Sequence, residues 1–129
     1  MNKKVLVVDD DPVVRVLITE FLQSRGYDVE TLENGSSCLE KLHSTTPDIL
    51  VLDMLMPDLT GIEVLKNIRK NPGTAKLPIV MLSADTDSET VVLNNNLSAD
   101  CDIRKPFGVN EIVGAVDTIA DKCAHTAAK

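Results

Sequence analysis

Residues 5–12 read Val-Leu-Val-Val-Asp-Asp-Asp-Pro, and this stretch decides the fold. Its first half is a continuous, largely β-branched apolar run, which is typical of a strand covered on both faces. Its second half predicts the start of a helix, because Asp11 can cap a helix and Pro12 suits the first turn. The helix is predicted to end at Gly26 and to turn one apolar stripe inward, made of Val14, Leu17, Ile18 and Phe21.

The same alternation of apolar runs and helix-periodic segments continues along the chain. Further strands are predicted at residues 27–32, 49–52, 79–82 and 101–104. Further helices are predicted at 37–44, from 61 to the Asn-Pro-Gly breaker at 71–73, at 87–97 and from 109 to 120. Five strands joined by helices need right-handed parallel crossovers, so we expect an α/β fold. The expected fold is a doubly wound, five-stranded parallel sheet with five helices. In such a fold the ligand site lies beyond the carboxyl ends of the strands.

The composition indicates one soluble domain. The chain has 129 residues, which is too short for two cores, so we expect a single domain over 1–129 with a structured core at about 4–122 and a tail at 123–129. Thirteen Lys and Arg against 20 Asp and Glu leave a net charge of −7, which argues against direct nucleic-acid binding. No segment predicts a membrane span or a signal peptide. The three cysteines lack a disulfide or zinc spacing, which favours the cytoplasm.

Polar side chains stand at the carboxyl ends of four predicted strands: Asp9, Asp10, Asp53, Ser83 and Lys105. Each one alone is most simply a helix cap, a turn residue or a solvated charge. Together they meet at one sheet edge, where three carboxylates repel one another unless a cation compensates them. Because the ligands are hard oxygens with no histidine or cysteine beside them, the expected cation is Mg²⁺. Ser83 and Lys105 then suit a phosphoryl group, with Asp53 as the nucleophile because its strand is central.

Four motifs carry a family resemblance. They are Val7-Val8-Asp9-Asp10-Asp11-Pro12, Leu52-Asp53-Met54-Leu55-Met56-Pro57-Asp58 with Gly61, Met81-Leu82-Ser83-Ala84, and Lys105-Pro106-Phe107. In this order and over nearly the whole chain, they resemble the receiver domain of two-component response regulators. The resemblance implies the flavodoxin-like strand order 2-1-3-4-5 that the chemotaxis regulator has.

The resemblance also implies a role for each acidic residue. Asp53 matches the aspartate that accepts a phosphoryl group from a sensor histidine kinase or a histidine phosphotransfer protein. Asp10 matches a direct Mg²⁺ ligand, together with Asp53 and the backbone carbonyl of Leu55. Asp9 matches the aspartate that acts mainly through metal-bound water.

The resemblance assigns Ser83 and Lys105 to the phosphoryl group as well. Ser83 matches the hydroxyl that shifts to bind it, and Lys105 matches the lysine that pairs with it. Such a domain catalyses only its own phosphorylation and dephosphorylation, so no further enzymatic activity is implied. The phosphorylated chain is expected to control a downstream effector or output domain through the face of helix 87–97, strand 101–104 and the last helix.

Asp102 departs from the family pattern, in which a tyrosine or phenylalanine commonly stands three positions before the lysine. A carboxylate is costly to bury in an apolar hole, so the usual aromatic switch cannot operate here. We expect Asp102 to stay on the surface and switching to run through residues 84–87 and helix 87–97.

Two other functions compete with this interpretation. One is a receiver-like interaction module that is never phosphorylated, which requires an intact site to be unused. The other is a Mg²⁺-dependent phosphatase of the haloacid-dehalogenase kind, whose opening Asp-x-Asp is matched by Asp9 and Asp11. Against the phosphatase, Pro12 indicates that Asp11 is a helix cap, and the chain has no room for a cap domain.

Overall fold

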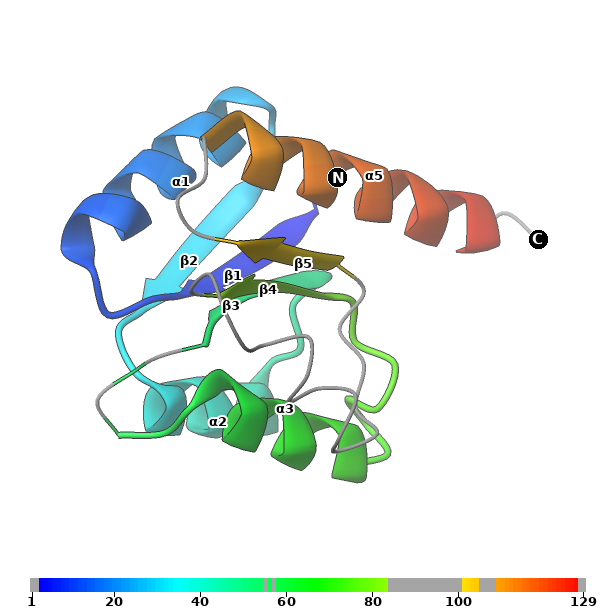
Figure 1. The fold of residues 1–129 in the computed structure, drawn as a ribbon. Coiled ribbons are helices and arrows are strands. Elements are labelled where there is room, and N and C mark those ends of the chain that lie inside the picture. The colour runs from blue at the N-terminus through cyan, green and yellow to red at the C-terminus, as the bar shows by residue number, and fades with distance from the viewer. Residues whose placement is uncertain (1–2, 55, 57, 84–100, 105–108, 128–129) are drawn as a thin grey trace.

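The strands form one parallel sheet of order β2-β1-β3-β4-β5 in the computed structural model, which describes residues 3–54, 56, 58–83, 101–104 and 109–127 (Figure 1). The strands are β1 (Lys4–Val8), β2 (Asp28–Leu32), β3 (Ile49–Asp53), β4 (Ile79–Ser83) and β5 (Cys101–Arg104). The helices in these ranges are α1 (Pro12–Ser24), α2 (Gly35–Ser44), α3 (Gly61–Lys70) and α5 (Val109–Ala127). The predicted fold class and strand order are confirmed, while the predicted helix 87–97 lies outside the described residues.

The sheet register brings the carboxyl ends of the strands to one edge. Val8 pairs with Leu52, and Asp53, one residue further along β3, pairs with Leu82 of β4. Ser83 pairs with Arg104 at the end of β5. Because all neighbouring strands run parallel, the carboxyl ends of the five strands lie at the same edge of the sheet.

Two hydrophobic layers sandwich the sheet, with α1 and α5 on one face and α2 and α3 on the other (Figure 1). Alternate residues of each central strand enter opposite layers, as the period of two in a β-strand requires. In β1, Val5 and Val7 join the α1/α5 layer, whereas Leu6 and Val8 join the α2/α3 layer. All five residues of β3 are buried, which explains why its sequence is continuously apolar until Asp53.

Helix α1 starts as predicted but turns a different stripe inward. The Asp11 side chain accepts a hydrogen bond from the amide of Val13, and Pro12 occupies the first turn. Ile18 and Leu22 are fully buried, and Val14 packs against them. The predicted inward positions Leu17 and Phe21 are wrong, since these side chains are 40% and 43% exposed. The apolar residues of α1 cover a broad arc, and contact with the sheet and α5 selects the i, i+4, i+8 stripe.

Two other helices differ from the predicted bounds. Helix α2 begins at Gly35, two residues before the predicted start, because the Asn34 side chain accepts from the amide of Ser37. Helix α5 continues to Ala127, beyond the predicted end at position 120. Helix α3 matches its prediction and ends before the Asn-Pro-Gly breaker at 71–73. Within the described ranges, no helix combines the length and the apolar character needed to cross a bilayer.

Candidate functional site

The segment after β1 holds Asp9 rigidly at the sheet edge. The amide of Asp9 donates to the carbonyl of Leu32 in β2 over 3.1 Å. One carboxylate oxygen of Asp9, Oδ1, accepts from the amide of Asp11 over 2.9 Å, and the side chain is completely buried. Asp10, in contrast, is exposed. Of the two predicted acids after β1, Asp9 is therefore buried and held by hydrogen bonds, whereas Asp10 is accessible to solvent.

Arg15 adds a contact to this segment that the sequence pattern did not indicate. Its guanidinium Nη1 donates a 2.6 Å hydrogen bond to the backbone carbonyl of Asp9. Arg15 lies in the first turns of α1, four residues after the capping Asp11. An arginine four residues after the capping Asp11 is the sequence signal for this contact. A helix has 3.6 residues per turn, so position 15 lies above the start of the helix, next to the segment that precedes it.

Asp53 ends β3 and is 1% exposed. The next residue, Met54, extends the sheet pairing by one bond, since its amide donates to the carbonyl of Leu82 over 2.7 Å. The amide of Gly61, the first residue of α3, then donates to the carbonyl of Met54 over 2.6 Å. A side chain at Gly61 would place its Cβ 2.7 Å from the backbone oxygen of Asp53. The backbone of α3 thus lies directly against the backbone of the predicted nucleophile.

Asp58, in the loop between β3 and α3, holds that loop to α2. Its carboxylate accepts from the amides of Gly35, Ser36 and Leu59 over 3.0, 2.9 and 2.8 Å. The Ser36 hydroxyl and amide, followed by the amides of Gly35 and Leu59, hold the pKa of the Asp58 carboxyl well below its usual value. Sequence pattern alone gives Asp58 no role, because two of its three partners, the amides of Gly35 and Ser36, lie more than 20 residues away in sequence.

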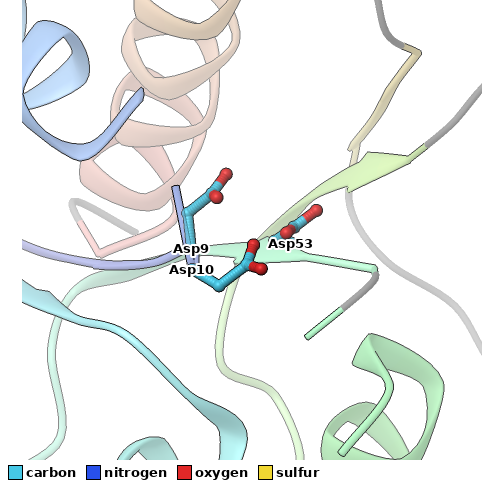
Figure 2. A group of neighbouring side chains, drawn as sticks. All are labelled: Asp9, Asp10 and Asp53. Atoms are coloured by element: carbon cyan, nitrogen blue, oxygen red, sulfur yellow. The ribbon is translucent and has the colours of Figure 1, made fainter. Parts of the chain in front are cut away.

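Three carboxylates meet where these segments converge. One carboxylate oxygen from each of Asp9, Asp10 and Asp53 lies within 4.8 Å of the others. Figure 2 shows that Asp9 and Asp10 come from the segment after β1, and Asp53 from the end of β3. Two of the three are buried, where neighbouring negative charges repel more strongly than they do in water. Hard oxygen donors at this spacing suit a divalent cation such as Mg²⁺.

The remaining predicted residues are described only in part. Ser83 is the last residue of β4, the strand next to β3, and its backbone pairs with Arg104. Lys105 and Leu55 lie outside the described residues. Asp102 lies in β5 opposite Met81. The structure therefore brings together the three predicted acids and places the backbone of Ser83 at the same sheet edge.

Comparison with known proteins identifies relatives of this chain. Residues 5–117 match the family model of the response regulator receiver domain. The chain is 40% identical over 119 residues to the alkaline phosphatase synthesis transcriptional regulatory protein PhoP of Bacillus subtilis, covering 92% of this chain and 49% of PhoP. It is 38% identical over 116 residues to the DNA-binding response regulator MtrA of Mycolicibacterium smegmatis, covering 90% of this chain and 50% of MtrA. The chain thus spans about half the length of these relatives.

Among solved structures, the fold matches the response regulator protein TrrA from Thermotoga maritima with a TM-score of 0.79. The two sequences are 35% identical, and the match covers 91% of this chain and 98% of TrrA. The TrrA structure was determined in complex with Mg²⁺–BeF.

Proposed function

Because this chain belongs to the family of response regulator receiver domains, we propose that Asp53 is its phosphoacceptor and receives a phosphoryl group from a phosphohistidine donor. The observation that carries the proposal is the meeting of Asp9, Asp10 and Asp53 within 4.8 Å at the ends of β1 and β3. The donor is a sensor histidine kinase or a histidine phosphotransfer protein. The domain is a signalling switch rather than an enzyme with an external substrate, and it works in the cytoplasm.

The same three acids hold Mg²⁺ in this proposal, with Asp10 and Asp53 as direct ligands, the Leu55 carbonyl as a third, and Asp9 acting mainly through water. When bound, Mg²⁺ neutralises the negative charge that develops on the oxygens of the transferred group. Three hydrogen bonds support this assignment, since they leave little freedom to the backbone of Asp9: its amide donates one, and its carbonyl and Oδ1 each accept one.

Phosphoryl transfer then requires the chain mainly to position an in-line attack. A carboxylate oxygen of Asp53 forms a bond to phosphorus as the bond from phosphorus to the donor's histidine nitrogen breaks, and the electron pair of that bond stays on the histidine. Lys105 and the Ser83 hydroxyl stabilise the charge on the transferred oxygens. The packing of Gly61 against the backbone of Asp53 supports the role of Asp53, because it restrains the backbone that carries the attacking carboxylate.

The phosphorylated site controls an output in this proposal. The added charge biases the conformation of the segments after β4 and β5, and a downstream effector or output domain reads the face expected from the predicted helix 87–97 together with β5 and α5. PhoP and MtrA carry about as much chain again beyond the matched part, and their names describe transcriptional and DNA-binding regulators. The net charge of −7 supports a domain that leaves nucleic-acid contact to other parts of a regulator.

Mass measurement after incubation with a small phosphodonor and Mg²⁺ tests the proposal. We expect the wild-type chain to gain the mass of one phosphoryl group and the Asp53→Asn variant to gain none. An unmodified wild-type chain would indicate an interaction module that does not use its acidic site. Turnover of a generic phosphomonoester by the wild-type chain would indicate a phosphatase instead.

A further inference from the structure

We infer that Asp58 is a positioning residue for the acidic cluster, because it ties the loop that follows Asp53 to the first turn of α2. Its two carboxylate oxygens accept from three backbone amides, of Gly35, Ser36 and Leu59, over 2.8 to 3.0 Å. Two of these amides, those of Gly35 and Ser36, belong to the first turn of α2 and lie more than 20 residues away in sequence. Asp58 therefore joins two segments that no local interaction would hold together.

The amides that Asp58 binds have no acceptor within α2 itself, because the first amides of a helix lack an intrahelical partner. The Asn34 side chain accepts from the amide of Ser37, and the Asn34 carbonyl accepts from the amide of Cys38. The amides of Gly35 and Ser36 are left, and Asp58 accepts from both. The positive end of the α2 dipole also favours a carboxylate at this position.

Close packing carries the position of Asp58 to Asp53. A Cβ at Gly35 would lie 2.9 Å from the Cβ of Leu59, so the residue after Asp58 rests directly on the start of α2. Thr60 then caps α3, and Gly61 donates to the carbonyl of Met54. Gly61 also lies so close to Asp53 that a side chain would meet its backbone oxygen. Asp58, α2, α3 and the end of β3 consequently form one packed unit.

This inference deepens the proposed function and rests on it, since it concerns the Mg²⁺ that the acidic cluster is proposed to bind. Releasing the loop frees the backbone of Asp53. The affinity for Mg²⁺ then falls, because the metal-binding carboxylate must be ordered when the ion binds. We expect Asp58→Ala to bind Mg²⁺ about tenfold more weakly, at the lower end of the effect of removing a partner that supports a metal ligand. Asp58→Asn keeps one acceptor oxygen and should give an intermediate affinity.

Isothermal titration of the unphosphorylated chain with MgCl₂ measures this effect without any phosphodonor. Asp48→Ala is the matched control, because Asp48 also accepts from a backbone amide, that of Lys4 over 2.7 Å, but before the start of β3. We expect Asp48→Ala to bind Mg²⁺ as the wild-type chain does. Circular dichroism verifies that each variant is folded, and if Asp58→Ala does not fold, Asp58→Asn carries the comparison.

Amide resonances provide a second, reciprocal measurement. If Asp58 couples α2 to the cluster, Mg²⁺ should shift the ¹⁵N–¹H signals of Gly35 and Ser36 with the same midpoint as those of Asp10 and Asp53. These shifts should disappear in Asp58→Ala. Equal Mg²⁺ affinity of Asp58→Ala and the wild-type chain would overturn the role of Asp58 and leave the proposed function standing. Absence of Mg²⁺ binding by the wild-type chain would overturn both.

Discussion

The amide of Gly61 donates a 2.6 Å hydrogen bond to the carbonyl of Met54, and this contact closes the loop that starts directly after Asp53. The loop can close so tightly only because position 61 has no side chain. A Cβ there would lie 2.7 Å from the backbone oxygen of Asp53 and 2.8 Å from the Cα of Met54. A glycine at the start of α3 thus determines how near the helix can lie to the predicted phosphoacceptor.

Replacing Gly61 with alanine should destabilise the protein by about 1–3 kcal/mol, the usual cost of overpacking. A glycine-to-alanine change in a helix normally stabilises, so the sign of the effect is diagnostic. Gly114→Ala is the matched control, because a Cβ there meets nothing within 4 Å, and it should stabilise by about 0.5–1 kcal/mol. Urea unfolding of both variants measures these changes in the free energy of unfolding. Equal destabilisation by Gly61→Ala and Gly114→Ala would contradict the prediction.

Asp53→Asn should stabilise the metal-free chain, because it removes one of three carboxylates within 4.8 Å. For each pair of carboxylates, relief of Coulomb repulsion at this distance should raise the free energy of unfolding by roughly 1–3 kcal/mol. The lower figure corresponds to the dielectric screening of water and the upper figure to that near a protein surface. The variant should also lose the stabilisation by Mg²⁺, which reaches about 2.7 kcal/mol at a hundredfold excess over the dissociation constant.

Urea unfolding in chelator and in MgCl₂ measures both effects. Asp28→Asn changes the net charge equally at an exposed position on β2, and it should show neither. A metal-free Asp53→Asn chain that is less stable than the wild-type chain would argue against repulsion in the cluster.

Cys38 should react with thiol reagents only after unfolding. Its side chain is fully buried in the α2/α3 layer, and burial raises the pKa of the thiol to about 12. In a chain with Cys101→Ser and Cys123→Ser, alkylation at pH 8 should be slower than in urea by orders of magnitude. Fast alkylation of the folded chain would show that α2 opens readily.

The same thiol should make stability depend on pH in alkaline solution. Because its pKa is raised by folding, its contribution is complete below the ordinary cysteine value of about 8.5 and is lost as pH rises toward 12. We expect Cys38→Ala, although less stable at neutral pH, to show a shallower decline of unfolding free energy between pH 8 and 10. Parallel declines of the two proteins would contradict this.

Tyr27→Phe should cost about 1.5–3 kcal/mol, because the Tyr27 hydroxyl donates to the carboxylate of Asp117 in a partly buried contact. Arg25 donates to the same carboxylate, but its side chain is 57% exposed, so Arg25→Met should cost less than about 1 kcal/mol. Chemical denaturation of the two variants separates these contributions. A larger loss from the arginine change would indicate that α5 is held mainly by the ion pair.

Asp58 should contribute to the acid sensitivity of the fold. Hydrogen bonds lower its pKa in the folded chain, so its stabilisation is present above the ordinary aspartate value of about 3.9 and is lost as pH falls below it. The wild-type chain should therefore lose more stability between pH 5 and pH 2.5 than Asp58→Asn does. Ser36→Ala, which removes the hydroxyl that lowers this pKa most, should lie between them in urea titrations at each pH.

The fold class could be predicted from local patterns, whereas the strand order followed only from the resemblance to receiver domains. Continuous apolar runs such as 49–52 identify strands covered on both faces, and the polar residue after each run marks the sheet edge where the site forms. Strand pairing then brings those ends together, so Asp9, Asp10 and Asp53 could be grouped without any coordinates. These inferences succeed because side-chain periodicity and strand direction are properties of neighbouring residues.

Tertiary packing decided what the local patterns leave open. The stripe of α1 that faces inward contains Leu22 rather than Phe21, because the apolar arc is broad and only the sheet and α5 select one side of it. The contacts of Arg15 and Asp58 also depend on where backbone carbonyls and amides lie in space. Every residue carries the same backbone groups, so the sequence alone determined which acids and strands build the site, and only the folded chain decided which amides and helices hold them in place.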